Sequence, residues 1–136
     1  MNVLLDLNVV LDFLLRRAPW SADADAIWDA QHEGRINAKL SAAALPTIFY
    51  IVRRTAGWDA AHDAIDECVS ALEFLNVDLP IVRVAQSLTG RDFEDNLQAA
   101  CAIEHQCSAI VTRDVGGFPG LPIDVLSPPD FLARLS

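Results

Sequence analysis

The chain has 136 residues, of which 52% are hydrophobic and 21% are charged, a composition that excludes a disordered chain. We expect one compact domain over residues 1–136 with no membrane segment, because no run approaches the ~20 apolar residues that cross a bilayer and the first residues lack the basic start of a secretory signal. The net charge of −9 excludes a protein that binds nucleic acid over a broadly basic surface.

The acidic balance also limits how this chain can act on nucleic acid. Phosphate neutralisation supplies much of the affinity for nucleic acid, so a nuclease of this charge needs divalent metal, a local arginine patch or a basic partner. The adjacent pairs Arg16-Arg17 and Arg53-Arg54 fall at predicted helix ends, where they can contact phosphate, cap the helix or dock an acidic partner. The three cysteines form no CxxC pair and favour a reducing, cytoplasmic setting.

Short apolar runs alternate with longer stretches of helical pattern along the chain. Strands alternating with helices predict a parallel sheet covered on both faces, which places the chain in the α/β class. In chain order the expected elements are a strand at 3–5, a helix capped by Asn8, a helix ended by Gly34, a strand at 37–40, a helix with Pro46 in its first turn, a helix at 59–74, shorter helices after Pro80 and Asp92, strands at 109–112 and 123–126, and a closing helix begun by Ser127.

Two acidic residues follow strongly apolar strands. Asp6 comes directly after the strand at 3–5, and Asp114 comes just beyond the strand at 109–112. Because the carboxyl ends of parallel strands meet along one edge of a sheet, these two acids can be neighbours. Their mutual repulsion favours a hard cation between them, either Mg²⁺ or Mn²⁺. Taken alone, each acid can also be a turn residue or a helix cap.

A third acidic cluster precedes a predicted helix. Asp92 has the position of an N-cap, and Glu94 and Asp95 then lie at the positive end of the helix. Asp95 can also project from the first turn into the pocket of Asp6 and Asp114. The two interpretations are compatible, and spacing alone leaves both open.

The remaining polar candidates are less specific. Asn8 and Asp12 share a face of the first helix; Asn8 can cap the helix or hold Asp6 in place as a hydrogen-bond donor. Asp12 is interpreted as a solvated or hydrogen-bonding residue in preference to a metal ligand. The histidines lack the spacing of metal ligands, and Gly116 and Gly117 are interpreted as turn glycines.

Three segments, taken in order, resemble a PIN domain of the kind found in VapC toxins. Residues 4–12 (LLDLNVVLD) resemble the opening strand and helix of that family. Residues 92–100 (DFEDNLQAA) resemble the helix that carries its third acid, and residues 110–114 (IVTRD) resemble its final strand with its acid. The resemblance covers nearly the whole chain and implies a PIN-like three-layer α/β/α sandwich with a central parallel sheet.

The resemblance also implies an activity and partners. It assigns Asp6, Asp95 and Asp114 as ligands of Mg²⁺ or Mn²⁺, with Asn8 and Thr112 as polar residues that line the site. The implied reaction is hydrolysis of an RNA phosphodiester, in which the metal lowers the pKa of a water and stabilises the leaving oxygen. It further implies the toxin of a toxin–antitoxin pair, a basic antitoxin as partner, and a homodimer.

One position departs from the family pattern. The family usually has an acid in the helix after the second strand, and Thr47 stands at that position here. A hydroxyl supplies no charge, so the site holds one metal instead of two, or holds it loosely, unless Asp92 or Glu94 compensates. Leu7 also replaces the usual threonine next to Asp6.

Two other classes of function compete with a ribonuclease. A catalytically degenerate interaction module keeps the fold after losing a site acid, and Thr47 is the feature that favours it. A phospho-acceptor receiver has a similar length and a similar alternation of strands and helices. It needs a lysine after a late strand, however, and the sole lysine, Lys39, is in the wrong place for that role. The sequence therefore favours a metal-dependent ribonuclease.

Overall fold

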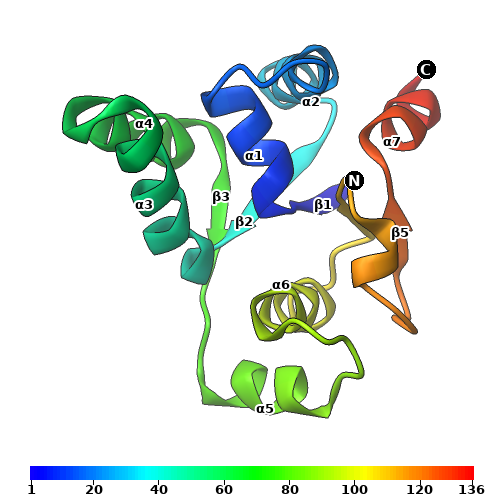
Figure 1. Cartoon of the computed structure of the whole chain (residues 1–136). Coiled ribbons are helices and arrows are strands. Elements are labelled where there is room, and N and C mark those ends of the chain that lie inside the picture. Colours follow the sequence, from blue (N-terminus) through cyan, green and yellow to red (C-terminus); the bar gives the residue numbers. More distant parts are fainter.

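The computed structural model describes residues 1–136 and contains five β-strands and seven α-helices (Figure 1). In chain order the elements are β1 (Asn2–Leu5), α1 (Leu7–Leu14), α2 (Ser21–His32), β2 (Asn37–Ser41), the 3-10 helix η1 (Ala42–Ala44), α3 (Leu45–Ala56), α4 (Trp58–Ala71), β3 (Glu73–Leu75), α5 (Leu79–Ser87), α6 (Phe93–Glu104), β4 (Ala109–Val111), the 3-10 helix η2 (Val115–Gly117), β5 (Asp124–Leu126) and α7 (Pro128–Leu135).

The five strands form one parallel sheet in the order β3-β2-β1-β4-β5. Strand β1 is central, because Val3 pairs with Ala38 of β2 on one side and with Ala109 of β4 on the other. The pairing continues past the end of β1, where the amide of Asp6 donates to the carbonyl of Val111 at 2.9 Å. The register therefore brings the residues that follow β1 and β4 to the same edge of the sheet.

The sheet separates two hydrophobic cores. Alternate residues of a strand point to opposite faces, so Val3 and Leu5 pack with α1, α2, α3, α4 and α7, whereas Leu4 packs with α5 and α6. Figure 1 shows these two groups of helices on opposite sides of the sheet. The predicted three-layer α/β/α sandwich with a central parallel sheet is confirmed.

Several helix boundaries agree with the caps expected from the sequence. The side chain of Asp92 accepts a hydrogen bond from the amide of Asp95 at 3.0 Å, and Ser127 accepts one from the amide of Asp130 at 3.3 Å. Gly34 follows α2 with φ of +73°, a conformation that favours glycine after a helix. Local chemistry therefore fixes where α6 and α7 begin.

Two expectations about the elements were wrong. Helix α1 is capped by Asp6, whose carboxylate accepts from the amide of Leu7 at 2.7 Å, and Asn8 lies within its first turn. The helix predicted at 59–74 ends at Ala71, and the next residues form the edge strand β3. The apolar residues before and within β3 continue the helical pattern of α4, so periodicity alone does not separate a short edge strand from the preceding helix.

Two further features concern the whole chain. None of the helices combines the length and the apolar character that a membrane crossing requires. Cys68, Cys101 and Cys107 are buried and unpaired, and burial raises the pKa of Cys68 to about 12 and that of Cys107 to about 11. These thiols are therefore packing residues and not nucleophiles.

Candidate active site

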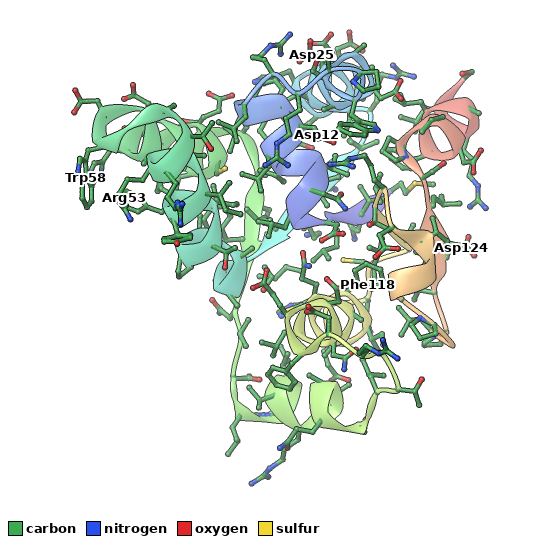
Figure 2. All side chains as sticks on the ribbon, in the orientation of Figure 1. Asp12, Asp25, Arg53, Trp58, Phe118 and Asp124 are labelled. Atoms are coloured by element: carbon green, nitrogen blue, oxygen red, sulfur yellow. The ribbon has the colours of Figure 1, made fainter.

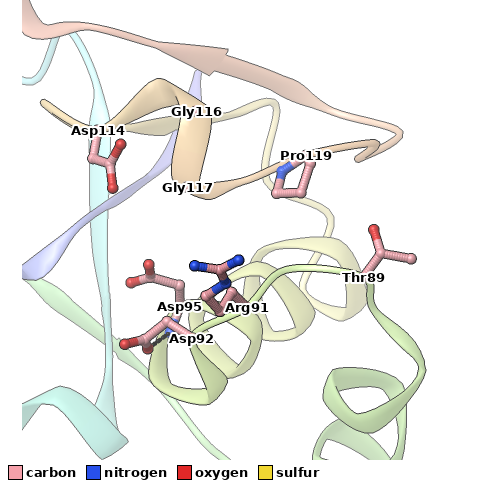
Figure 3. Close-up of a pocket in the computed structure, with 8 residues that line it drawn as sticks. All are labelled: Thr89, Arg91, Asp92, Asp95, Asp114, Gly116, Gly117 and Pro119. Carbon is pink, nitrogen blue, oxygen red and sulfur yellow. Dashed lines mark hydrogen bonds between the residues drawn. The ribbon is translucent and has the colours of Figure 1, made fainter.

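A cavity of about 550 Å³ opens between the start of α6 and the loop that follows β4 (Figure 3). Asp92 enters it as the N-cap residue of α6, Asp95 from the first turn of that helix, and Asp114 from the loop. The cavity is polar, and its lining consists of Thr89, Arg91, Asp92, Asp95, Asp114, Gly116, Gly117 and Pro119.

Asp6 is buried at the carboxyl end of β1 and is held by three hydrogen bonds. Its Oδ1 accepts from the amide of Leu7 at 2.7 Å and from Nε2 of Gln98 at 2.8 Å, and its Oδ2 accepts from Oγ1 of Thr112 at 2.6 Å. Hydrogen bonds to a carboxylate are stronger than neutral ones and fix its orientation. Oδ1 therefore already accepts two hydrogen bonds, whereas Oδ2 accepts one and still has lone-pair capacity for a further partner.

The predicted polar residues Asn8 and Thr112 connect Asp6 to the loop that carries Asp114. The hydroxyl of Thr112 donates to Asp6 and accepts from the amide of Asp114 at 2.9 Å. Asn8 donates to Oγ1 of Thr112 at 3.5 Å and accepts from the amide of Arg113 at 3.3 Å. Asn8 therefore reaches Asp6 through Thr112 and not directly.

The negative charge around Asp95 is uncompensated. The pKa of Asp95 is raised to about 7, first by burial and then by the charges of Asp6, Asp92, Asp114 and Glu94. No arginine or lysine forms an ion pair with any of these five carboxylates. A cluster of this kind attracts either protons or cations.

Gly117 allows the loop to lie against two of these carboxylates. A Cβ atom at this position would lie 2.7 Å from Oδ2 of Asp114 and 3.3 Å from Oδ2 of Asp95. At the neighbouring Gly116, the nearest atom to such a Cβ would be Oδ1 of Asp114 at 4.0 Å. Asp95 and Asp114 therefore border the same small space, and a side chain at position 117 would fill it.

The chemistry of this space fits a divalent cation. Carboxylate oxygens are the ligands that Mg²⁺ and Mn²⁺ prefer, and no arginine or lysine is ion-paired with the carboxylates of the cluster. No three histidine, cysteine, aspartate or glutamate side chains converge as they stand to hold an ion.

Comparison with known proteins assigns the chain to a family. A family model described as a PIN domain matches residues 2–116. This chain belongs to the PIN-domain family. No curated protein sequence matches the chain.

Solved structures share the PIN fold with this chain at low sequence identity. DNA-bound VapBC from Salmonella typhimurium has a TM-score of 0.71 and 14% identity, with 94% of this chain and 98% of that chain covered. VapBC2 from Rickettsia felis, bound to a promoter DNA fragment, has a TM-score of 0.69 and 16% identity, with 93% and 98% covered. VapC20 from Mycobacterium tuberculosis, described as a Sarcin-Ricin loop cleaving toxin, has a TM-score of 0.67 and 13% identity, with 79% and 86% covered.

The position at which the PIN resemblance predicts an acid is occupied by Thr47, on α3. Its hydroxyl donates to Oε2 of Glu94 at 3.2 Å. Helix α6 therefore brings a carboxylate to the residue that replaces the expected acid. Of the two acids that could compensate for the missing one, Asp92 is engaged as the N-cap of α6, whereas Glu94 has no such capping role.

Asp12 lies outside the cavity and has its own cations. Its Oδ2 accepts from Nε of Arg113 at 2.6 Å, and its Oδ1 accepts from Nη2 of the same residue at 3.1 Å. Arg17 lies 3.8 Å from Asp12, and the guanidinium of Arg113 lies 3.8 Å from the ring centroid of Trp20. Asp12 is thus a buried hydrogen-bonding residue that anchors the segment before Asp114.

Sequence reasoning missed the roles of Gln98 and Gly117 at this candidate site. Gln98 donates to Asp6, and its Oε1 is buried without a partner. A signal for it exists, because Gln98 is polar within an apolar helical stretch and lies one turn after Asp95, on the same face. No sequence signal reveals how closely Gly117 approaches the carboxylates, because that distance depends on the folded loop.

Proposed function

We propose that this PIN-domain protein is a ribonuclease that uses Mg²⁺ or Mn²⁺ to hydrolyse RNA phosphodiester bonds. The observation that carries the proposal is the group of uncompensated carboxylates at one cavity, in which Asp95 has a pKa raised to about 7. Asp6, Asp95 and Asp114 are the proposed ligands of the metal. They come from three separate segments of the chain, and the parallel sheet and α6 bring them to the same region.

In the proposed reaction the residues of the chain position the metal and its substrate. The bound metal supplies a water of lowered pKa and stabilises charge on the phosphate oxygens. Gln98 and Thr112 orient the carboxylate of Asp6 through their hydrogen bonds. Asp95, whose pKa is raised to about 7, is partly protonated near neutral pH and would release that proton when a cation binds.

We also propose that the protein is a cytoplasmic toxin, that a basic antitoxin binds it, and that it forms a homodimer. Structurally similar proteins are described as VapBC complexes and as a toxin–antitoxin complex from Klebsiella pneumoniae. The net charge of −9 suits a basic partner, because complementary charge speeds association. The homodimer is proposed from the family resemblance.

A catalytically degenerate interaction module is the second candidate. Thr47 in place of the expected acid favours it, and so does the lack of three converging metal-ligating side chains. The hydrogen bond between Thr47 and Glu94 favours the ribonuclease, because it brings a carboxylate to the altered position.

Cleavage of mixed cellular RNA by the purified protein, freed of any partner, distinguishes the two candidates. The reactions contain Mn²⁺, Mg²⁺ or EDTA and compare the wild type with Asp114→Asn and Asp124→Asn. Asp124, on β5 (Figure 2), is a matched control because it is also exposed, but it lies outside the cavity and pairs with Arg134 of α7.

We expect the wild type and Asp124→Asn to cleave RNA with Mn²⁺ or Mg²⁺ and not in EDTA. Asp114→Asn should lose roughly a hundredfold or more of the rate, since removing a ligand costs more than removing a group that orients one. A folded, partner-free wild type that cleaves no RNA under any of these conditions favours the interaction module.

A further inference from the structure

The ten basic residues of this acidic chain differ in whether their charge is already engaged. Arg53 lies 4.7 Å from the ring centroid of Trp58 (Figure 2), and Arg54 donates to the hydroxyl of Tyr50 at 3.0 Å. These contacts engage one of the two arginine pairs that the sequence offered for phosphate. Six others form ion pairs with aspartate or glutamate, namely Arg16, Arg17, Arg35, Lys39, Arg113 and Arg134.

Two arginines remain, Arg83 and Arg91, and neither has an ion pair, a side-chain hydrogen bond or an aromatic contact. Of the ten basic residues, only Arg91 lines the carboxylate cavity. Figure 3 shows its guanidinium in the space between the start of α6 and the Gly116–Gly117 loop. Arg83 lies on α5, which contributes no residue to the cavity.

Arg91 is free although acids surround it. Asp92, Asp95 and Asp114 line the same cavity, yet none of them lies within ion-pair distance of its guanidinium. Arg113, which is next to Asp114 in the sequence, is engaged by Asp12 instead. The planar fork of Arg91, with five N–H donors, is therefore available to an anion that enters from solvent.

A phosphodiester group is the anion that fits both the cavity and the guanidinium. An RNA strand that approaches this cavity is repelled by five carboxylates, and a metal bound among them offsets that repulsion only near itself. Arginine binds phosphate through two parallel hydrogen bonds, which gives orientation as well as attraction. A cation at the rim of the cavity would therefore hold the strand where the carboxylates alone would repel it.

We propose that Arg91 binds a phosphodiester group of the substrate RNA at the rim of the carboxylate cavity. This inference rests on the proposed ribonuclease function and adds a phosphate subsite to the same site. The subsite positions the strand across Asp95 and Asp114. It also explains how a chain with a net charge of −9 can hold a polyanion without a broadly basic surface.

The test compares Arg91→Gln and Arg91→Lys with the matched control Arg83→Gln. Thermal unfolding of each variant first establishes that it is folded, which is expected because both arginines are exposed. Cleavage of a fluorescent RNA oligonucleotide then gives kcat and KM at several salt concentrations. Binding of the same oligonucleotide is measured by fluorescence anisotropy in an Asp114→Asn background, so that binding is followed without cleavage.

Arg91→Gln should raise KM and the dissociation constant about tenfold, because a charge-assisted phosphate contact is lost. It should also reduce the dependence of log K on log salt by about 0.7, the value for one phosphate of a single strand. The KM and dissociation constant of Arg91→Lys should lie between those of the wild type and Arg91→Gln, since lysine keeps the charge but lacks the planar fork of donors. Arg83→Gln should behave as the wild type.

Two results would overturn the proposal in different ways. If the wild type cleaves RNA while Arg91→Gln and Arg83→Gln have equal KM, affinity and salt dependence, the phosphate subsite is wrong and the ribonuclease stands. If the folded wild type neither binds nor cleaves RNA, the subsite falls together with the function on which it rests.

Discussion

Asp6 and Asp12 belong to the same helix, as its N-cap and as an interior residue, and both are buried, but their electrostatic surroundings are opposite. Asp12 accepts two hydrogen bonds from Arg113 and lies near Arg17, so its charge is offset within the chain. Asp6 accepts only from neutral donors and adds its charge to the cluster around Asp95.

The difference separates a structural acid from acids kept for a ligand. A buried ion pair holds together the two segments that carry its partners. Removing one partner lowers the free energy of unfolding strongly, because the other charge is left buried without a partner. A group of carboxylates without cations destabilises the folded chain, and such groups cluster at functional sites. The segment from Thr112 to Asp114 therefore joins the two, because Arg113 neutralises Asp12 and Asp114 belongs to the uncompensated group.

The largest expected effect is the loss of stability caused by Asp12→Ala, which removes the neutralised acid. The change removes the partner of Arg113, whose side chain is only 25% exposed, and should lower the free energy of unfolding by about 3 kcal/mol. The control Asp25→Ala breaks an exposed pair with Arg16 and should cost under about 1 kcal/mol. Urea unfolding in EDTA measures both, and equal small losses would show that Asp12 is not a structural anchor.

The second prediction concerns Asp95, in the uncompensated group of carboxylates, and the pH dependence of stability that it causes. The pKa of Asp95 is about 7 in the folded chain against an ordinary value of 3.8, so between these pH values the folded state binds the extra proton. Its contribution to the free energy of unfolding therefore falls as pH rises from about 4 to 7. Asp95→Asn removes this loss and should be more stable than the wild type by roughly 1–3 kcal/mol at pH 8.

Urea unfolding of wild type and Asp95→Asn in EDTA, at pH 4.5 and pH 8, measures that difference. We expect the two proteins to be nearly equal at the lower pH, where the folded wild type carries a protonated Asp95. Asp124→Asn serves as the control for an exposed, paired aspartate. A difference between wild type and Asp95→Asn that is the same at both pH values would contradict the raised pKa.

A smaller effect is expected from Gly117→Ala. The added Cβ would lie 2.7 Å from Asp114 and would push its carboxylate away from Asp95. Displacing one ligand should weaken Mn²⁺ binding and RNA cleavage about tenfold. Gly116→Ala, whose Cβ has no neighbour nearer than 4.0 Å, should stay within about twofold of the wild type. Equal effects at the two glycines would argue against a shared space between the carboxylates.

The α/β fold was predictable because its signals are local and periodic. The apolar runs of β1 and β4 and the caps Asp92 and Ser127 mark strands and helix starts directly. Strand β3 was not predictable in the same way, because three residues at a sheet edge do not show an alternation that differs from the end of α4. Its identity depends on pairing with β2 in the folded sheet.

The candidate site was predictable to the extent that it follows from strand order. Asp6 and Asp114 follow strands β1 and β4, which the parallel sheet makes neighbours. The spacing of Gln98 from Asp95 places it on the same face of α6, but the roles of Gly117 and Arg91 depend on the course of two loops, which no spacing in the sequence specifies. For the same reason Asn8 was expected to cap α1, whereas Asp6 has that place.

Titration calorimetry of Mn²⁺ with the wild type and Asp95→Asn, in several buffers near pH 7, tests the central claim most directly. The account predicts that the wild type binds Mn²⁺ with release of protons, seen as a buffer-dependent enthalpy, because Asp95 is partly protonated before the ion binds. Asp95→Asn should lose both the binding and the proton release. A wild type that binds no Mn²⁺, or an Asp95→Asn variant that binds it equally well, would contradict the assignment of these carboxylates to a cation.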